Sequence, residues 1–94
     1  MSNIYEGLFI IKPELSEDEA KGAYKAILDM VAKNGGSLKK EEMWGKRPLA
    51  YPVKKAKEAY YYKLDFEAPA ESITKLEAAY KLNPSILRTL ITRR

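Results

Sequence analysis

The chain has 94 residues, of which 46% are hydrophobic and 32% are charged, and its formal net charge is +4. A chain of this length supports one modest hydrophobic core, so we expect residues 1–94 to form a single domain. It contains neither cysteine nor histidine, which excludes disulfides, thiolate metal sites and histidine-based catalysis. No secretion signal and no apolar run of the roughly 20 residues that a membrane span requires is present, so we expect a cytosolic protein.

Residues 4–11 predict a strand, because β-branched and aromatic residues dominate a short run that Lys12-Pro13 ends. Strand alternation separates two sets of side chains, Tyr5, Gly7, Phe9 and Ile11 on one face and Ile4, Glu6, Leu8 and Ile10 on the other. Both sets are largely apolar. Either the sheet is covered on both faces, or one face is left for a partner.

A helix is predicted to follow, with Ser16 as its N-cap and Glu19 completing a capping box. Its buried stripe has helical spacing and consists of Ala20, Ala23, Tyr24, Ile27, Leu28 and Val31. The Asn34-Gly35-Gly36 sequence supplies the left-handed stop.

The second half of the chain predicts a hairpin, a helix and a last strand. Residues 37 to about 47 alternate loosely as an exposed, charged strand, a loop that carries the rest of the central motif follows Arg47, and residues 56–58 turn the chain. Residues 59–67 alternate cleanly, and the set expected to face the helices is Tyr60, Tyr62, Leu64 and Phe66. Pro69 suits the first turn of a second helix, which Asn83-Pro84 ends. The buried stripe of this helix consists of Ile73, Leu76, Ala79 and Tyr80. Residues 86–92 are predicted to form the fourth strand.

The predicted order is therefore β-α-β-β-α-β, which indicates an α+β, ferredoxin-like open-faced sandwich. Right-handed crossovers place both helices on one face of a four-stranded antiparallel sheet. The other face is then uncovered, and we expect Leu8, Ile10, Tyr61 and Leu90 to lie on it. An exposed apolar patch of this kind usually marks a binding partner.

Positive charge is concentrated in the middle of the chain. Residues 39–57 contain seven basic and two acidic residues, a net charge of +5, whereas the remaining residues sum to −1. A basic segment of this kind favours a polyanion such as RNA. A solvated hairpin whose lysines protect an exposed strand edge explains the charge equally well.

Catalysis is not expected. Acyl-phosphate hydrolysis on this fold requires a phosphate-cradling loop with an arginine after the first strand, where this chain has Lys12-Pro13-Glu14-Leu15. Gly35-Gly36 ends a helix instead of opening one, and Glu41 and Glu42 point to opposite faces of a strand. We expect no cofactor and no small-molecule substrate.

The sequence Gly-Lys-Arg-Pro-Leu-Ala-Tyr-Pro-Val over residues 45–53 resembles the central signature of the bacterial small ribosomal subunit protein six family. Tyr5-Glu6 and Pro13-x-Leu15 match flanking features of that family. The resemblance implies a ribosomal location in the cytoplasm and binding to the central domain of small-subunit ribosomal RNA. It also implies a heterodimer with small-subunit ribosomal protein eighteen, formed through the open sheet face.

The resemblance and the charge pattern together give two sets of candidate residues. Those expected to contact RNA are Lys46, Arg47, Lys54, Lys55, Arg88, Arg93 and Arg94. Those expected to contact the protein partner are Leu8, Ile10, Tyr51, Tyr61 and Leu90. The competing interpretation is a protein-interaction or small-ligand regulatory module on the same fold that binds no RNA.

Overall fold

The computed structural model describes residues 2–53 and 56–94, with side chains described for residues 3–49 and 57–94. The elements follow the predicted order along the chain: β1 (Ser2–Ile11), α1 (Glu17–Lys33), β2 (Ser37–Val53), β3 (Ala56–Pro69), α2 (Ala70–Lys81) and β4 (Ile86–Arg93). Neither helix in this described part of the chain is long and apolar enough to cross a membrane.

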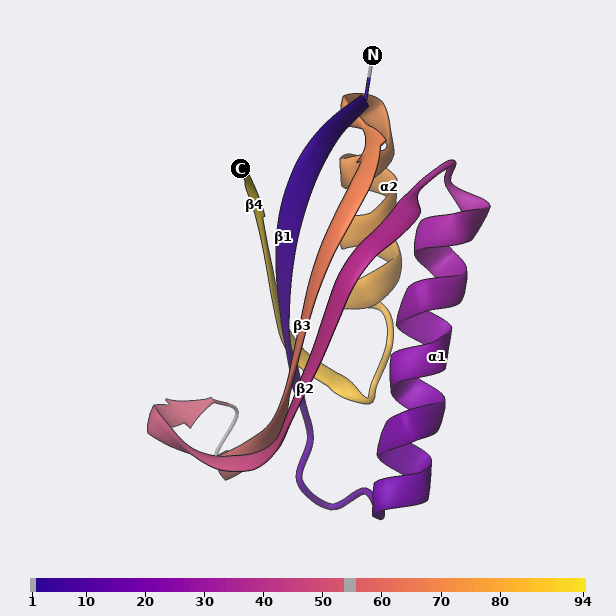
Figure 1. The fold of residues 1–94 in the computed structure, drawn as a ribbon. Coiled ribbons are helices and arrows are strands. Elements are labelled where there is room, and N and C mark those ends of the chain that lie inside the picture. Colours follow the sequence, from indigo (N-terminus) through magenta and orange to yellow (C-terminus); the bar gives the residue numbers. More distant parts are fainter. Residues whose placement is uncertain (1, 54–55) are drawn as a thin grey trace.

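The strands form one antiparallel sheet in the order β2-β3-β1-β4. Figure 1 shows both helices on the same side of this sheet, while no helix covers the other side. This arrangement confirms the predicted ferredoxin-like sandwich with one open face.

The central strand β1 separates its side chains as predicted. Tyr5, Phe9 and Ile11 are buried beneath the helices, whereas Ile4 and Leu8 point to the open face and are more accessible. Phe9 packs edge-on against Tyr80 of α2, with the ring centroids 5.0 Å apart. The doubled apolar pattern of this strand therefore reflects one covered face and one open face.

Local sequence signals define both ends of α1. The hydroxyl of Ser16 accepts a hydrogen bond from the Glu19 amide, and the Glu19 carboxylate accepts one from the Ser16 amide at 2.9 Å. The bond from the Ser16 amide favours the ionised carboxylate and lowers the pKa of Glu19 below its ordinary value. After Asn34 caps the C-terminus, Gly35 turns the chain with φ of 80°, a conformation that glycine adopts without a steric penalty.

Hydrogen bonds between distant segments fix the helices on the sheet and on each other. The buried Tyr80 hydroxyl of α2 donates to the Ile27 carbonyl of α1 at 2.8 Å, and the Ser72 hydroxyl donates to the Asn34 carbonyl at 2.7 Å. Tyr60 of β3 donates to the Leu15 carbonyl before α1, also at 2.8 Å. These three bonds satisfy polar atoms that the core would otherwise leave unpaired.

The hairpin between β2 and β3 is longer than predicted. The expected loop after Arg47 and the expected turn at 56–58 are wrong where the structure describes them, because β2 continues through Pro48 to Val53 and β3 begins at Ala56. Lys54 and Lys55, which the expected loop included, lie outside the described residues. The strands still pair at Pro48 with Glu58 and at Val53 with Ala56. Because β2 is an edge strand, one side of it forms no hydrogen bonds with another strand. A proline, which has no backbone N–H to donate, is therefore tolerated there. Figure 1 shows this hairpin curling away beyond the body of the sheet.

Tyr80→Phe removes the hydroxyl that links α2 to α1 while keeping the buried ring. We expect the free energy of unfolding to fall by about 1 kcal/mol, the usual contribution of one buried hydrogen bond, measured by urea denaturation. Tyr61→Phe is the matched control, because Tyr61 lies half-buried on the open face, and its change should stay within about 0.5 kcal/mol. Equal effects of the two substitutions would contradict the structural role of the Tyr80 hydroxyl.

Candidate interaction surfaces

The open sheet face carries an apolar cluster near the root of the hairpin. In register across the strands, Ile10 of β1 lies between Tyr61 of β3 and Arg88 of β4, and the neighbouring Leu8 lies between Lys63 and Leu90. Trp44 of β2 stacks on Tyr61 with ring centroids 6.0 Å apart and an interplanar angle of 12°. We define the apolar cluster as Leu8, Ile10, Trp44, Tyr61 and Leu90.

Members of the apolar cluster differ in how much surface they offer. Trp44 and Leu90 are 41% and 42% exposed, whereas Ile10 retains only 7% of its surface even though it points to the uncovered side. Ile10 is flanked in register by the long side chains of Tyr61 and Arg88. It therefore supports the cluster from within, and the contact surface is offered mainly by its neighbours.

Ion pairs occupy the remainder of the open face. The Lys63 ammonium lies 3.4 Å from the Glu6 carboxylate and 3.6 Å from that of Glu42. Lys39 pairs with Glu67 at 3.2 Å, and Arg94 pairs with Asp65 at 2.9 Å. Surface pairs of this kind add little stability. The ion pairs do bring positive and negative side chains together, so this part of the open face has little net charge. The apolar cluster is therefore the feature of the open face that favours a protein partner.

A β-bulge places Trp44 on the open face and Lys46 on the helix side. The register shifts between Met43 and Gly45, and Gly45 adopts φ of 75°. The backbone kink is stabilised by Arg47, whose Nε donates to the Trp44 carbonyl at 3.1 Å. Such bulges redirect side chains at strand edges.

Two of the predicted RNA-contacting residues lie together at this bulge. Lys46 and Arg47 are both exposed, and the Lys46 ammonium lies 5.3 Å from the centroid of the Tyr60 ring. The bond from Arg47 uses Nε, and a guanidinium carries four further N–H donors on its terminal nitrogens. Lys54 and Lys55 lie outside the described residues, as does the side chain of Tyr51.

The other three basic candidates are not brought to the hairpin. Arg88, Arg93 and Arg94 belong to the C-terminal end of the chain, on or just after β4, which is the sheet edge opposite β2. Arg94 is held by Asp65, and Arg88 borders the apolar cluster through its register with Ile10. Among the described candidates, the structure thus brings Lys46 and Arg47 together and distributes Arg88, Arg93 and Arg94 along the opposite sheet edge.

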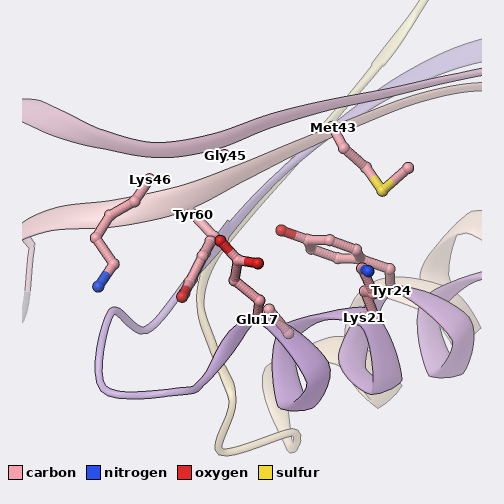
Figure 2. Close-up of a pocket in the computed structure, with 8 residues that line it drawn as sticks. Glu17, Lys21, Tyr24, Met43, Gly45, Lys46 and Tyr60 are labelled. Carbon is pink, nitrogen blue, oxygen red and sulfur yellow. The ribbon is translucent and has the colours of Figure 1, made fainter.

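A pocket that the sequence analysis missed lies on the helix side of the bulge. It has a volume of about 440 Å³ and lies between the first turns of α1 and the strands β2 and β3 (Figure 2). Its lining residues are Glu17, Ala20, Lys21, Tyr24, Met43, Gly45, Lys46 and Tyr60. Trp44 was also missed as a surface residue. A glycine beside a tryptophan within a strand pattern could have indicated the bulge that positions both features.

Within the described residues, no group of three or more acidic side chains is arranged to hold a metal ion. The fold and its surfaces define an open-faced α+β sandwich of the kind that leaves one sheet face for contact with other molecules. The family model described as "Ribosomal protein S6" matches residues 4–93. The chain belongs to the ribosomal protein S6 family.

Individual relatives agree with this membership. The chain is 38% identical over 89 residues to small ribosomal subunit protein bS6 of Thermoanaerobacter pseudethanolicus, covering 95% of this chain and 94% of the relative. It is 41% identical over 88 residues to bS6 of Dictyoglomus turgidum, covering 94% and 91% of the two chains. The crystal structure of 30S ribosomal protein S6 from Thermotoga maritima superposes with a TM-score of 0.94 at 30% identity, covering 100% of this chain and 89% of that one.

Members of this family are structural, non-enzymatic components of the small ribosomal subunit. Family membership therefore confirms the predicted resemblance, the prediction that the chain is not an enzyme, and the expected location in cytoplasmic ribosomes.

Proposed function

We propose that this chain, acting as a single domain, binds the central domain of small-subunit ribosomal RNA together with small-subunit ribosomal protein eighteen. The observation that carries the proposal is the sheet face that no helix covers, which displays an apolar cluster and adjoins the edge-strand bulge that bears the exposed Lys46 and Arg47. The two features favour different partners, because one is apolar and the other cationic.

The apolar cluster is the proposed contact for the protein partner. Trp44 and Tyr61 form a flat aromatic surface, and Leu8 and Leu90 continue it across β1 and β4. Aromatic residues in the centre of a protein interface commonly contribute most of its binding energy. The surrounding ion pairs would then form a polar rim.

The basic bulge is the proposed contact for RNA. Lys46 and Arg47 lie at the root of the hairpin, where cationic side chains would neutralise phosphates. Lys54 and Lys55 are proposed as further RNA contacts from the sequence alone. Arg88, Arg93 and Arg94 form a second proposed contact at the opposite sheet edge. Phosphate contacts of this type position RNA without reading its sequence.

Binding to a ribosomal RNA fragment should weaken steeply as salt is raised, because each neutralised phosphate releases counterions. We expect a log-log slope of roughly −0.7 to −0.9 per contact, by analogy with simpler nucleic acids. Arg47→Ala should reduce the steepness by up to about one unit. The measurement is a fluorescence anisotropy titration at several salt concentrations.

Lys75→Ala is the control for that titration, because Lys75 is exposed on α2 and away from the hairpin. It should leave the slope unchanged. A slope that is flat for the unmodified chain would instead support a protein-interaction module without RNA binding.

Leu8→Asp places a carboxylate in the apolar cluster, on the strand position paired with Lys63 and Leu90. We expect it to weaken pairing with small-subunit ribosomal protein eighteen by at least about tenfold, since a charge in the centre of an apolar interface costs more than 1.4 kcal/mol. The fold should survive because Leu8 already faces solvent in part. Isothermal titration calorimetry measures the pairing, and circular dichroism checks the fold.

Leu82→Asp provides the matched control, since Leu82 is 84% exposed after α2 and lies outside the apolar cluster. It should leave pairing unchanged. Undiminished pairing of the Leu8→Asp chain would reject the open face as the partner interface.

A further inference from the structure

The pocket on the helix side of the bulge is separate from the open face and adjoins the proposed RNA-contacting residues. Its apolar surface comes from Ala20 and Tyr24 of α1, Met43 of β2 and Tyr60 of β3. Its volume of about 440 Å³ is within the range of sites that hold small organic groups. The pocket therefore offers an apolar site large enough for a planar ring.

Two polar groups point into this space. Figure 2 shows the Tyr24 hydroxyl and the Glu17 carboxylate directed toward the gap between α1 and β2. One face of the Tyr24 ring is fixed by stacking on Tyr62, with centroids 4.2 Å apart and an interplanar angle of 13°. Burial also raises the pKa of Tyr24, so its hydroxyl keeps its proton and is able to donate a hydrogen bond.

Positive charge flanks the polar groups. In Figure 2 the ammonium groups of Lys21 and Lys46 lie on opposite sides of the Glu17 carboxylate. Lys46 belongs both to the pocket and to the basic bulge, so the two surfaces are continuous. An aromatic pocket with one hydrogen-bonding edge and cations on both sides matches a base whose neighbouring phosphates lie outside the pocket.

We propose that this pocket receives one unstacked base of the RNA strand that contacts the basic bulge. In this arrangement Glu17 accepts a hydrogen bond from the exocyclic amino group of the base, and the Tyr24 hydroxyl bonds to an adjacent ring or carbonyl atom. Lys21 and Lys46 contact the phosphates on either side. The inference rests on the proposed RNA binding and adds a preference for bases that carry an amino group, such as adenine.

The test compares three single-stranded hexamers, oligo(A), oligo(U) and an abasic ribose-phosphate chain. Each is titrated into the complete chain at low salt and followed by ¹H–¹⁵N NMR. Oligo(A) should bind more tightly than the other two and should shift the amide signals of Tyr24, Met43 and Gly45. The abasic chain should affect chiefly the signals of Lys46 and Arg47.

Two substitutions probe the base-reading groups. Tyr24→Phe keeps the stack on Tyr62 and removes the hydroxyl, and Glu17→Gln changes an exposed side chain that the helix cap does not use. Relative to abasic binding, each should weaken oligo(A) binding about threefold to tenfold, because Tyr24→Phe removes one hydrogen bond and Glu17→Gln replaces a charged acceptor with a weaker neutral one. Tyr24→Phe should leave abasic binding itself unchanged. Glu71→Gln, an exposed acid in the first turn of α2 and outside both surfaces, is the matched control and should change neither.

The outcomes separate this inference from the proposed function. If all three hexamers bind equally, and neither Tyr24→Phe nor Glu17→Gln weakens oligo(A), the base pocket is rejected while RNA binding through phosphates stands. If no hexamer binds and the ribosomal RNA fragment also fails to bind, both proposals are rejected. Selective loss of oligo(A) binding in both variants supports the pocket.

Discussion

The aromatic stack of Tyr62 on Tyr24 joins the sheet to α1, and the positions of both surfaces depend on it. Tyr62 is fully buried, and its ring centroid lies 4.2 Å from that of Tyr24 and 6.2 Å from that of Phe9. Its hydroxyl donates a hydrogen bond to the Glu41 carboxylate. Burial, together with this hydrogen bond, raises the pKa of Tyr62 far above its ordinary value, so the phenol stays neutral inside the core. Because the Tyr62 side chain of β3 packs against α1, the side chain of the neighbouring residue Tyr61 faces away from the helices.

The bulge at Trp44 and Gly45 divides the edge strand between the two sides of the sheet. The side chains of β3 alternate regularly between the two faces of the sheet opposite Trp44 and Gly45. The one extra residue on β2 at this point therefore changes which face the following β2 side chains occupy. Trp44 consequently stacks on Tyr61 at the open face, whereas Lys46 lies over Tyr60 on the helix side. One backbone irregularity therefore supplies the aromatic part of one surface and the cation of the other.

The sequence predicts those parts of the structure that local rules determine. The capping box at Ser16 and Glu19, the stripe of α1 and the alternation of β1 were all confirmed, because each depends on residues close together in the chain. The hairpin was predicted too short, since proline is equally compatible with a loop and an edge strand, and only the pairing with β3 decides between them. The burial of Ile10, the Arg94–Asp65 ion pair and the pocket were not predicted, because each brings together side chains from different strands or from a strand and a helix.

The same geometry bears on whether two partners could bind at once. The apolar cluster and the pocket lie on opposite faces of the sheet but share the short segment that contains Trp44 and Lys46. A protein seated on Trp44 would therefore not occupy the space between α1 and β2, and RNA at the pocket would not cover Leu8 or Leu90. Contact at either surface would nevertheless hold the bulge in place, since Trp44 and Lys46 are only two residues apart and the Arg47 side chain bonds to the Trp44 carbonyl. The two partners would therefore share a backbone support without sharing a contact surface.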